Sequence, residues 1–151
     1  MRPKLWIFGL LFILLLPLTA RARLGETLEE CIARYGKPVK VNPGNSPEAR
    51  KIAAGYEFKK NNLRITCVIY SDTGTCCTVF YKNWDNSKMA RDDQYRILGA
   101  IEEPGNWRPM EDQDGKAWTS EKTGNVAILK EASIVIVSRD KLKEGQGLGG
   151  L

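Results

Sequence analysis

Four cysteines are the residues of this chain with the most evident chemical potential. They are Cys31, Cys67, Cys76 and Cys77, in a chain of 151 residues that contains no histidine. Structural zinc sites and thioredoxin-type redox sites both rely on C-x-x-C spacing, which does not occur here. Without histidine, Ser-His-Asp and Cys-His catalysis and mixed Cys/His metal sites are excluded. The cysteines are therefore candidates for disulfides, or else buried thiols that behave as small apolar side chains.

The predicted elements bring three of these cysteines onto apolar faces. Cys31 lies on the apolar face of a predicted helix, and Cys67 on that of a predicted strand. Strand alternation places Cys77 on an inward face and turns Cys76 the other way. If the helix packs on this face, Cys31 can meet Cys67 or Cys77. A hairpin with a short loop at residues 71–73 would instead place Cys67 opposite Cys77. The predicted disulfide candidates are Cys31, Cys67 and Cys77.

Adjacent carboxylates are a second source of chemistry. Two carboxylates that face each other across a cleft can hydrolyse a glycosidic bond. Neighbouring side chains in one helix point in different directions, so adjacency in the sequence does not predict such a cleft. We assign no catalytic, cofactor-binding or metal-binding residue and expect no cofactor. The carboxylate pairs are Glu29-Glu30, Asp92-Asp93, Glu102-Glu103 and Glu111-Asp112.

Loop tryptophans are candidates for contact with a partner. Trp84 follows a predicted strand, and Trp107 stands beside Arg108 in a Gly-Asn-Trp-Arg segment. Exposed aromatic side chains next to arginine are typical anchors of protein interfaces. Trp84, Trp107 and Arg108 are therefore the candidate partner surface. The alternative is that each ring closes one end of the core, as we expect for Trp118 in the middle of a predicted strand.

The first 22 residues have the composition of a secretory signal peptide. Arg2 and Lys4 precede an unbroken apolar run over residues 5–16, and small residues follow at Ala20 and Ala22. This order of basic, apolar and small-residue regions predicts export and cleavage after Ala22. An uncleaved membrane anchor is the alternative, although a helix over residues 5–18 would be too short to cross the roughly 30 Å hydrocarbon core of a bilayer. We expect the protein in the periplasm or the medium, with membrane contact only through an uncleaved signal.

Removing this segment changes the charge balance. The full chain has 23 basic and 18 acidic residues, and Arg2, Lys4 and Arg21 belong to the signal. The mature chain then has 20 basic and 18 acidic residues, a net charge of +2. Its basic residues are scattered, whereas nucleic-acid binding needs a concentrated basic face. No nucleic-acid partner is expected.

The pattern predicts two helices. Residues 24–36 carry a capping box at Thr27 and Glu30, an apolar face at i, i+3, i+4 and i+7, and a stop at Gly36 followed by Pro38. A second helix is predicted from about residue 87 or 91 to residue 103, where Pro104-Gly105 ends it.

Six strands are predicted from alternation and turn residues. Gly74 suits a positive φ angle in the turn at residues 71–74, and residues 122–125 form the predicted turn between the strands at 116–121 and 125–130. Residues 42–47 are expected to form a loop because they are rich in Asn, Pro, Gly and Ser. The predicted strands cover residues 52–59, 63–70, 75–82, 116–121, 125–130 and 133–138.

Together these elements predict an α+β domain. A helix followed by a three-stranded antiparallel meander occurs twice, with the helices on one face of the sheet. The pattern leaves open whether the strands form one sheet or two. The expected organisation is a signal peptide at 1–22, one domain at 23–139 with a duplicated helix-plus-meander unit, and a disordered tail at 140–151.

The segment from Leu24 to Pro38 carries a family resemblance. It begins with Gly-x-Thr at Gly25 and Thr27, continues as a short amphipathic helix, and ends with Tyr-Gly-x-Pro at Tyr35, Gly36 and Pro38. This pattern resembles the opening of small exported α+β domains. These domains include outer-membrane assembly lipoproteins of the SmpA/OmlA type and β-lactamase inhibitory proteins. The chain also resembles uncharacterised exported bacterial proteins of this pattern, although it lacks the lipidated cysteine of the lipoproteins.

The resemblance implies a non-catalytic module that binds protein outside the cytoplasm. The expected function is thus an exported binding module for another protein or an envelope component. A small carboxylate-dependent hydrolase is the alternative.

Overall fold

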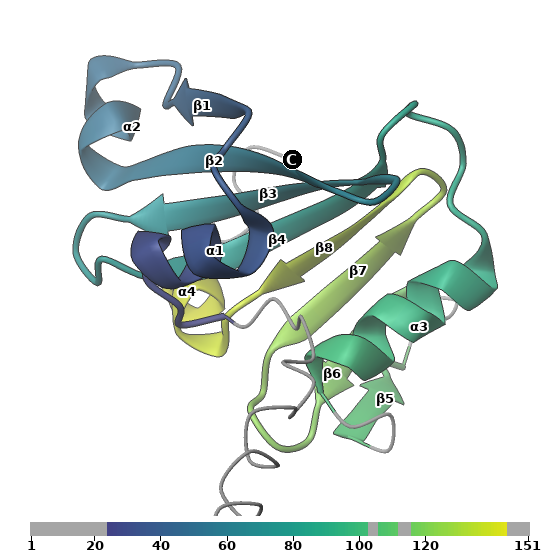
Figure 1. Ribbon diagram of the computed structural model, residues 1–151. Helices are drawn as coiled ribbons and strands as arrows, with labels where there is room; N and C mark the ends of the chain where they lie inside the picture. Colours follow the sequence, from purple (N-terminus) through teal and green to yellow (C-terminus); the bar gives the residue numbers. More distant parts are fainter. Residues whose placement is uncertain (1–23, 103–105, 112–115, 145–151) are drawn as a thin grey trace, which may run out of the picture.

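The strands of the protein form one antiparallel sheet (Figure 1). The computed structural model describes residues 24–102, 106–111 and 116–144. Eight strands are found in this part of the chain: β1 (Lys40–Pro43), β2 (Ala53–Lys60), β3 (Leu63–Tyr70), β4 (Cys76–Asn83), β5 (Trp107–Pro109), β6 (Ala117–Ser120), β7 (Val126–Lys130) and β8 (Ser133–Val137).

The order of the strands joins two four-stranded halves at the centre. The order is β1-β2-β3-β4-β8-β7-β6-β5, and β4 pairs with β8 from Thr78↔Val137 to Lys82↔Ser133. The prediction of a helix plus a three-stranded meander, made twice, is therefore wrong. The described residues form a single eight-stranded sheet that carries four short helices.

The prediction failed at the two edges of the sheet. Strands β1 and β5 are short, and each has two or three exposed side chains. A strand at an edge needs backbone pairing on one side only, so neither segment shows the alternation of apolar and polar residues that marks a buried strand. Both end in proline, at Pro43 and Pro109, which is tolerated at an edge because no further strand requires the missing N–H.

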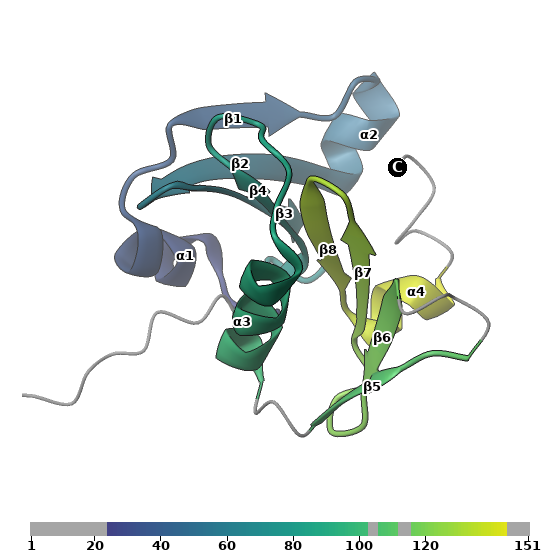
Figure 2. The same cartoon turned by 90° about the vertical axis from the view of Figure 1, so that its right-hand side faces the viewer.

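The helices lie on both faces of the sheet (Figure 2). Helices α1 (Leu28–Tyr35) and α3 (Arg91–Ile101) cover one face, where Cys31, Tyr35 and Leu98 enter the core. Helix α4 (Arg139–Lys143) lies near Tyr70 on the other face. Helix α2 (Pro47–Ile52) has no buried residue. The expectation that all helices share one face thus holds only for α1 and α3.

Local chemistry sets the ends of α1. Thr27 Oγ1 accepts from the Glu30 amide at 3.3 Å, and Glu30 Oε2 accepts from the Thr27 amide at 2.8 Å. This is the predicted capping box. Gly36 ends the helix at φ 87°, and its amide donates to the Ile32 carbonyl at 2.8 Å. The prediction of this helix end is confirmed.

The core lies between the sheet and the two helices α1 and α3. Strand β8 is buried along its whole length and supplies Ile134 and Ile136 to the core. The core cluster consists of Cys31, Tyr35, Phe58, Ile65, Cys67, Cys76, Val79, Tyr81, Met89, Leu98, Trp107, Ala127, Leu129, Ile134 and Ile136.

The fold continues past the predicted domain boundary at residue 139. Helix α4 begins at Arg139 and extends into the segment expected to be a tail, and its Lys141 is 2% exposed. Residues 145–151 and the predicted signal peptide at 1–22 lie outside the described residues. Among the described residues, no helix combines the length and the apolar character needed to cross a bilayer.

Candidate functional site

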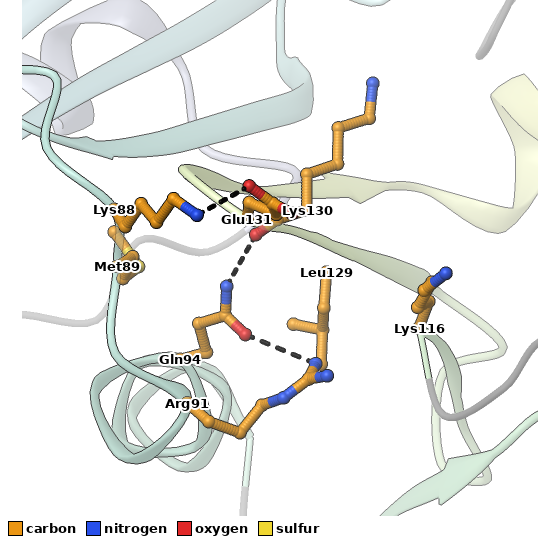
Figure 3. A pocket seen from close by; sticks show the side chains of 8 residues that line it. All are labelled: Lys88, Met89, Arg91, Gln94, Lys116, Leu129, Lys130 and Glu131. Atoms are coloured by element: carbon orange, nitrogen blue, oxygen red, sulfur yellow. Dashed lines mark hydrogen bonds and ion pairs between the residues drawn. The ribbon is translucent and has the colours of Figure 1, made fainter.

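A basic pocket of about 300 Å³ lies between the start of α3 and the β7–β8 turn (Figure 3). Its lining combines four cationic side chains with one carboxylate. Buried Met89, Gln94 and Leu129 form its inner part. The cationic side chains are Lys88, Arg91, Lys116 and Lys130, and the carboxylate is Glu131.

Hydrogen bonds hold the wall of this pocket in place. Gln94 is 2% exposed, and its Nε2 donates to the Lys130 carbonyl at 2.7 Å. Its Oε1 accepts from Arg91 at 3.4 Å. The Met89 amide donates to the Glu131 carbonyl at 3.0 Å. Since these bonds join α3 and the preceding loop to the β7–β8 turn, the pocket has a defined shape.

The charge of the pocket is strongly unbalanced. Lys88 pairs with Glu131 at 3.2 Å, and both side chains are 81% exposed, so solvent weakens this pair. Lys116 and Lys130 are exposed and form no ion pair with any residue that the structure describes. Figure 3 shows the Lys130 side chain extending away from Gln94. An excess of positive charge around a pocket raises the local concentration of anions.

Trp84 lies in a second basic region, at the end of β4. It is half-buried, with Lys59 Nζ 4.5 Å and Arg64 Cζ 5.0 Å from its ring centre. Arg64 also donates to the Trp84 carbonyl and pairs with Glu57 at 3.6 Å. A second, smaller pocket of about 200 Å³ is lined by Arg64 and Glu57. The ring is held mainly by its own neighbours, with part of it open to solvent.

The other two candidates for the partner surface lie elsewhere. Trp107 is 4% exposed, and its Nε1 donates to the Leu98 carbonyl at 3.0 Å, so its ring closes the core beneath α3. Arg108 is exposed on the edge strand β5 and pairs with Glu121 at 3.1 Å. Since Trp84 lies in the other half of the sheet, the structure does not bring these three residues together.

A β-bulge changes which cysteines meet. The register runs from Cys67↔Val79 to Ile69↔Cys76 and shifts between Val68 and Ile69, so Cys77 is an extra residue in β4. Cys76 therefore faces the core with Cys31 and Cys67, and the expectation that Cys77 faces inward is wrong. An extra residue reverses the alternation of a strand, and the sequence pattern did not reveal it.

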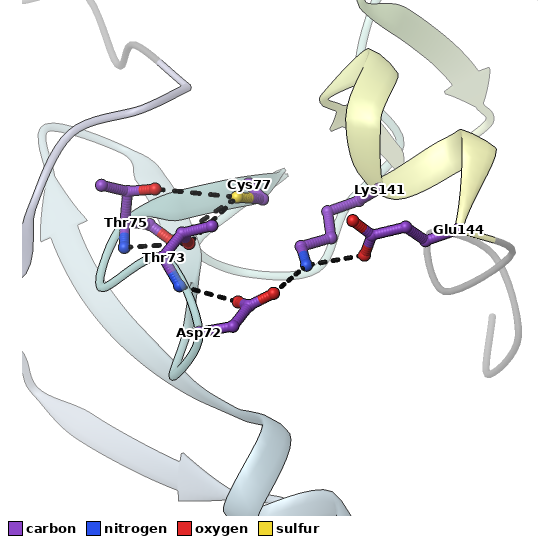
Figure 4. Close-up of polar contacts among 6 residues, drawn as sticks. All are labelled: Asp72, Thr73, Thr75, Cys77, Lys141 and Glu144. Carbon is purple, nitrogen blue, oxygen red and sulfur yellow. Dashed lines mark hydrogen bonds and ion pairs between the residues drawn. The ribbon is translucent and has the colours of Figure 1, made fainter.

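Cys77 lies among threonines on the other side of β4. Its sulfur is 3.7 Å from Thr73 Oγ1 and 3.8 Å from Thr75 Oγ1 (Figure 4). All four cysteines are buried free thiols. The disulfides expected from the sequence are therefore not formed in this structure, and their formation stays a prediction.

The carboxylate pairs do not meet in either pocket. Glu131 is the single carboxylate that lines the basic pocket, and Glu57 is the single carboxylate that lines the smaller pocket. Glu30 serves the cap of α1, and Glu102 accepts from Thr123 Oγ1 at 2.7 Å. Residues 103 and 112 lie outside the described residues.

The cations of the basic pocket do not form a recognisable motif in the sequence. Its cations stand at residues 88, 91, 116 and 130, too far apart to appear as a basic run. They converge because β6 and β7 pair next to α3. The only local clue is Gln94, a polar residue on the apolar side of the predicted helix.

Among the described residues, no group of three or more potential ligands is arranged to hold a metal ion. The fold and the pocket define an α+β protein with one antiparallel sheet and, among the described residues, a basic cavity between the start of α3 and the β7–β8 turn. No protein family, curated protein or solved structure shows a significant match to the chain. The resemblance to SmpA/OmlA-type and β-lactamase-inhibitory domains therefore stays a prediction.

Proposed function

We propose that this protein is an exported, non-catalytic binding module that recognises an anionic group of another protein or of an envelope component. The observation that carries the proposal is the basic pocket at the start of α3. Its four cations and single carboxylate leave an excess of positive charge around a cavity of about 300 Å³. Carboxylate and phosphate groups are the common anions that lysine and arginine bind through charged hydrogen bonds.

The shape of the pocket favours a small ligand group. A volume of about 300 Å³ is at the lower end of ligand pockets, large enough for one or two acidic side chains. Met89 and Leu129 supply apolar contact for the carbon part of such side chains. An acidic segment of another protein fits this combination best, because it offers both carboxylates and methylene groups.

The binding test uses charge reversal with a matched control. The double variant Lys116→Glu/Lys130→Glu changes two exposed cations of the pocket. The control Lys37→Glu/Lys51→Glu changes the net charge equally at exposed positions in the other half of the protein. The probe is a fluorescent oligo-glutamate peptide, followed by anisotropy at two salt concentrations.

We expect the pocket variant to weaken peptide binding about tenfold or more, since two charge contacts are reversed, and the control to change it less than about twofold. Binding by the wild type should weaken as salt rises. Equal losses in both variants, or no binding by the wild type, would contradict the proposal. Inorganic phosphate and phosphatidylglycerol vesicles are then tested as competitors of the oligo-glutamate peptide. This comparison distinguishes a protein ligand from an envelope lipid.

Export is tested separately by cell fractionation and intact mass. We expect the protein outside the cytoplasm with a mass that begins at Arg23. Full-length protein in the cytosol would contradict export without bearing on the pocket.

A further inference from the structure

Three thiols from three different elements meet inside the core. Cys31 comes from α1, Cys67 from β3 and Cys76 from β4, and they are at most 1% exposed. All three side chains belong to the same buried core cluster. The β-bulge creates this arrangement because it turns Cys76 inward and Cys77 outward.

The backbone of Cys76 is hydrogen-bonded to the segment that leads into α1. The Gly25 amide donates to the Cys76 carbonyl at 2.7 Å, and the Cys76 amide donates to the Glu26 carbonyl at 2.7 Å. These bonds fasten the entry of α1 to the start of β4. Cys31 lies one turn into α1. The bonds between the entry of α1 and Cys76 therefore set the position of Cys31 against the sheet face that carries Cys67 and Cys76.

We infer that Cys31 is the shared partner of a disulfide that forms with either Cys67 or Cys76, while the third thiol stays in contact and exchanges with it. A direct Cys67–Cys76 bond is disfavoured. The register places these residues diagonally on neighbouring strands, where Cα atoms lie about 7–8 Å apart, beyond the usual span of a disulfide.

The electrostatics of the cluster agree with this role for Cys31. Hydrogen bonds from Cys67 and Cys76 lower the pKa of Cys31, and the Arg34 guanidinium lowers it further. The contact with Cys31 raises the pKa of Cys67 and of Cys76. The thiolate is the nucleophile in disulfide chemistry, so Cys31 is the thiol best suited to attack first.

The oxidation requires a small or protein disulfide as oxidant. The Cys31 thiolate attacks one sulfur of oxidised glutathione, which gives a mixed disulfide and releases one glutathione thiolate. Cys67 or Cys76 then loses its proton and attacks the Cys31 sulfur, which releases the second glutathione. The two protons of the protein thiols end on the two released glutathione molecules. Exchange follows when the remaining thiolate attacks Cys31 and expels its first partner, with no net oxidation.

Burial sets the conditions of the experiment. The three sulfurs are shielded in the folded protein, so glutathione is supplied during refolding, when it can reach Cys31 as α1 docks against Cys67 and Cys76. The protein is purified as cells produce it, reduced in denaturant, refolded with reduced and oxidised glutathione, then denatured in acid and alkylated. Intact mass counts the free thiols, and peptide mapping identifies the bonded pairs.

We expect two of the four thiols to be alkylated, with Cys31 bonded to Cys67 in some molecules and to Cys76 in others. The variants Cys67→Ala and Cys76→Ala should each keep one disulfide, and Cys31→Ala should keep none. Cys77→Ala is the matched control and should keep the disulfide. Reduction should lower the urea midpoint of the wild type and leave that of Cys31→Ala unchanged.

Three results would overturn the inference: four alkylated thiols in the refolded wild type, a Cys67–Cys76 bond in Cys31→Ala, or Cys77 in the mapped disulfide. If an alanine variant does not fold, the peptide map of the wild type decides by itself. The outcome is independent of the proposed ligand and of export, because the oxidant is supplied in the buffer.

Discussion

Lys141 and Asp72 form an ion pair across 69 residues of sequence, with Nζ 2.6 Å from Oδ2 (Figure 4). The Lys141 side chain is 2% exposed, and its Nζ also lies 2.8 Å from Glu144 and 4.8 Å from the centre of the Tyr70 ring. A buried ammonium group needs such partners because its desolvation is costly. The pair therefore fastens α4 to the β3–β4 turn.

The pH dependence of this ion pair follows from the directions in which the pKa values of Asp72 and Lys141 are shifted. The ammonium of Lys141 and the amide of Thr73 lower the pKa of Asp72, whereas Asp72 and Glu144 raise that of Lys141. A lowered carboxyl pKa gives stability that is present above the unfolded value near 3.9 and is lost as pH falls through the folded value. Because the pKa of Lys141 is raised, its ammonium group stays charged at neutral pH, and the ion pair contributes to stability there.

We therefore expect Asp72→Asn to lower the urea midpoint at pH 7 and to have little effect near pH 2. Asp140→Asn removes an exposed carboxylate of α4 and serves as the control. Urea unfolding followed by circular dichroism at both pH values measures the difference. An Asp72→Asn effect of equal size at both pH values would show that the ion pair is not its cause.

Trp107 is expected to contribute to stability rather than to partner contact. Trp107→Phe removes the hydrogen bond to the Leu98 carbonyl and part of a buried ring, which should cost about 1–3 kcal/mol. Trp84→Phe weakens contacts with Lys59 and Arg64 at a half-buried site and should cost about 1 kcal/mol or less. Chemical denaturation measures the free energy of unfolding of both variants. A larger loss of stability for Trp84→Phe than for Trp107→Phe would reverse the assignment of Trp107 to the core and Trp84 to the surface.

The cap of α1 is expected to matter more than the cap of α2. Thr27→Ala removes the acceptor for the Glu30 amide and should cost about 1 kcal/mol, because α1 packs into the core. Ser46→Ala removes the corresponding bond to Ala49, but α2 buries no residue, so its fraying should hardly change global unfolding. Urea unfolding checks both, and equal losses would mean that α2 unfolds together with the core.

Two glycines should respond in opposite ways to alanine. Gly74 has φ +66° in the β3–β4 turn, so Gly74→Ala should cost about 1 kcal/mol or more. Gly55 lies within β2, where an added Cβ would meet Thr66 Cγ2 at an ordinary 3.5 Å. Gly55→Ala should be neutral or stabilising, because it restricts the unfolded chain without strain. Thermal unfolding of both variants measures the contrast, which a destabilising Gly55→Ala would refute.

Elements with local signals were readable from the sequence. The capping box at Thr27 and Glu30 is formed, and Gly74 has the positive φ angle that its turn requires. The expected strand at residues 63–70 is β3 with the same bounds. In each case the interacting groups are within a few residues, so the pattern records them directly.

The edge strands were not readable because half of their environment is solvent. β1 and β5 have too few buried residues to produce an alternation, and α2 and α4 are too short to show a helical period. The candidate site was likewise hidden, because its cations come from segments up to 42 residues apart in the chain, from Lys88 to Lys130.

By itself, the sequence determined the hairpins, the ends of α1 and the absence of histidine chemistry, since these depend on composition or on neighbours along the chain. Only the tertiary structure decided that β4 pairs with β8, that the bulge turns Cys76 rather than Cys77 toward Cys31, and that Lys141 is buried against Asp72. Each of these depends on partners that are distant in sequence, and their contact is selected by packing of the whole sheet and not by any local preference.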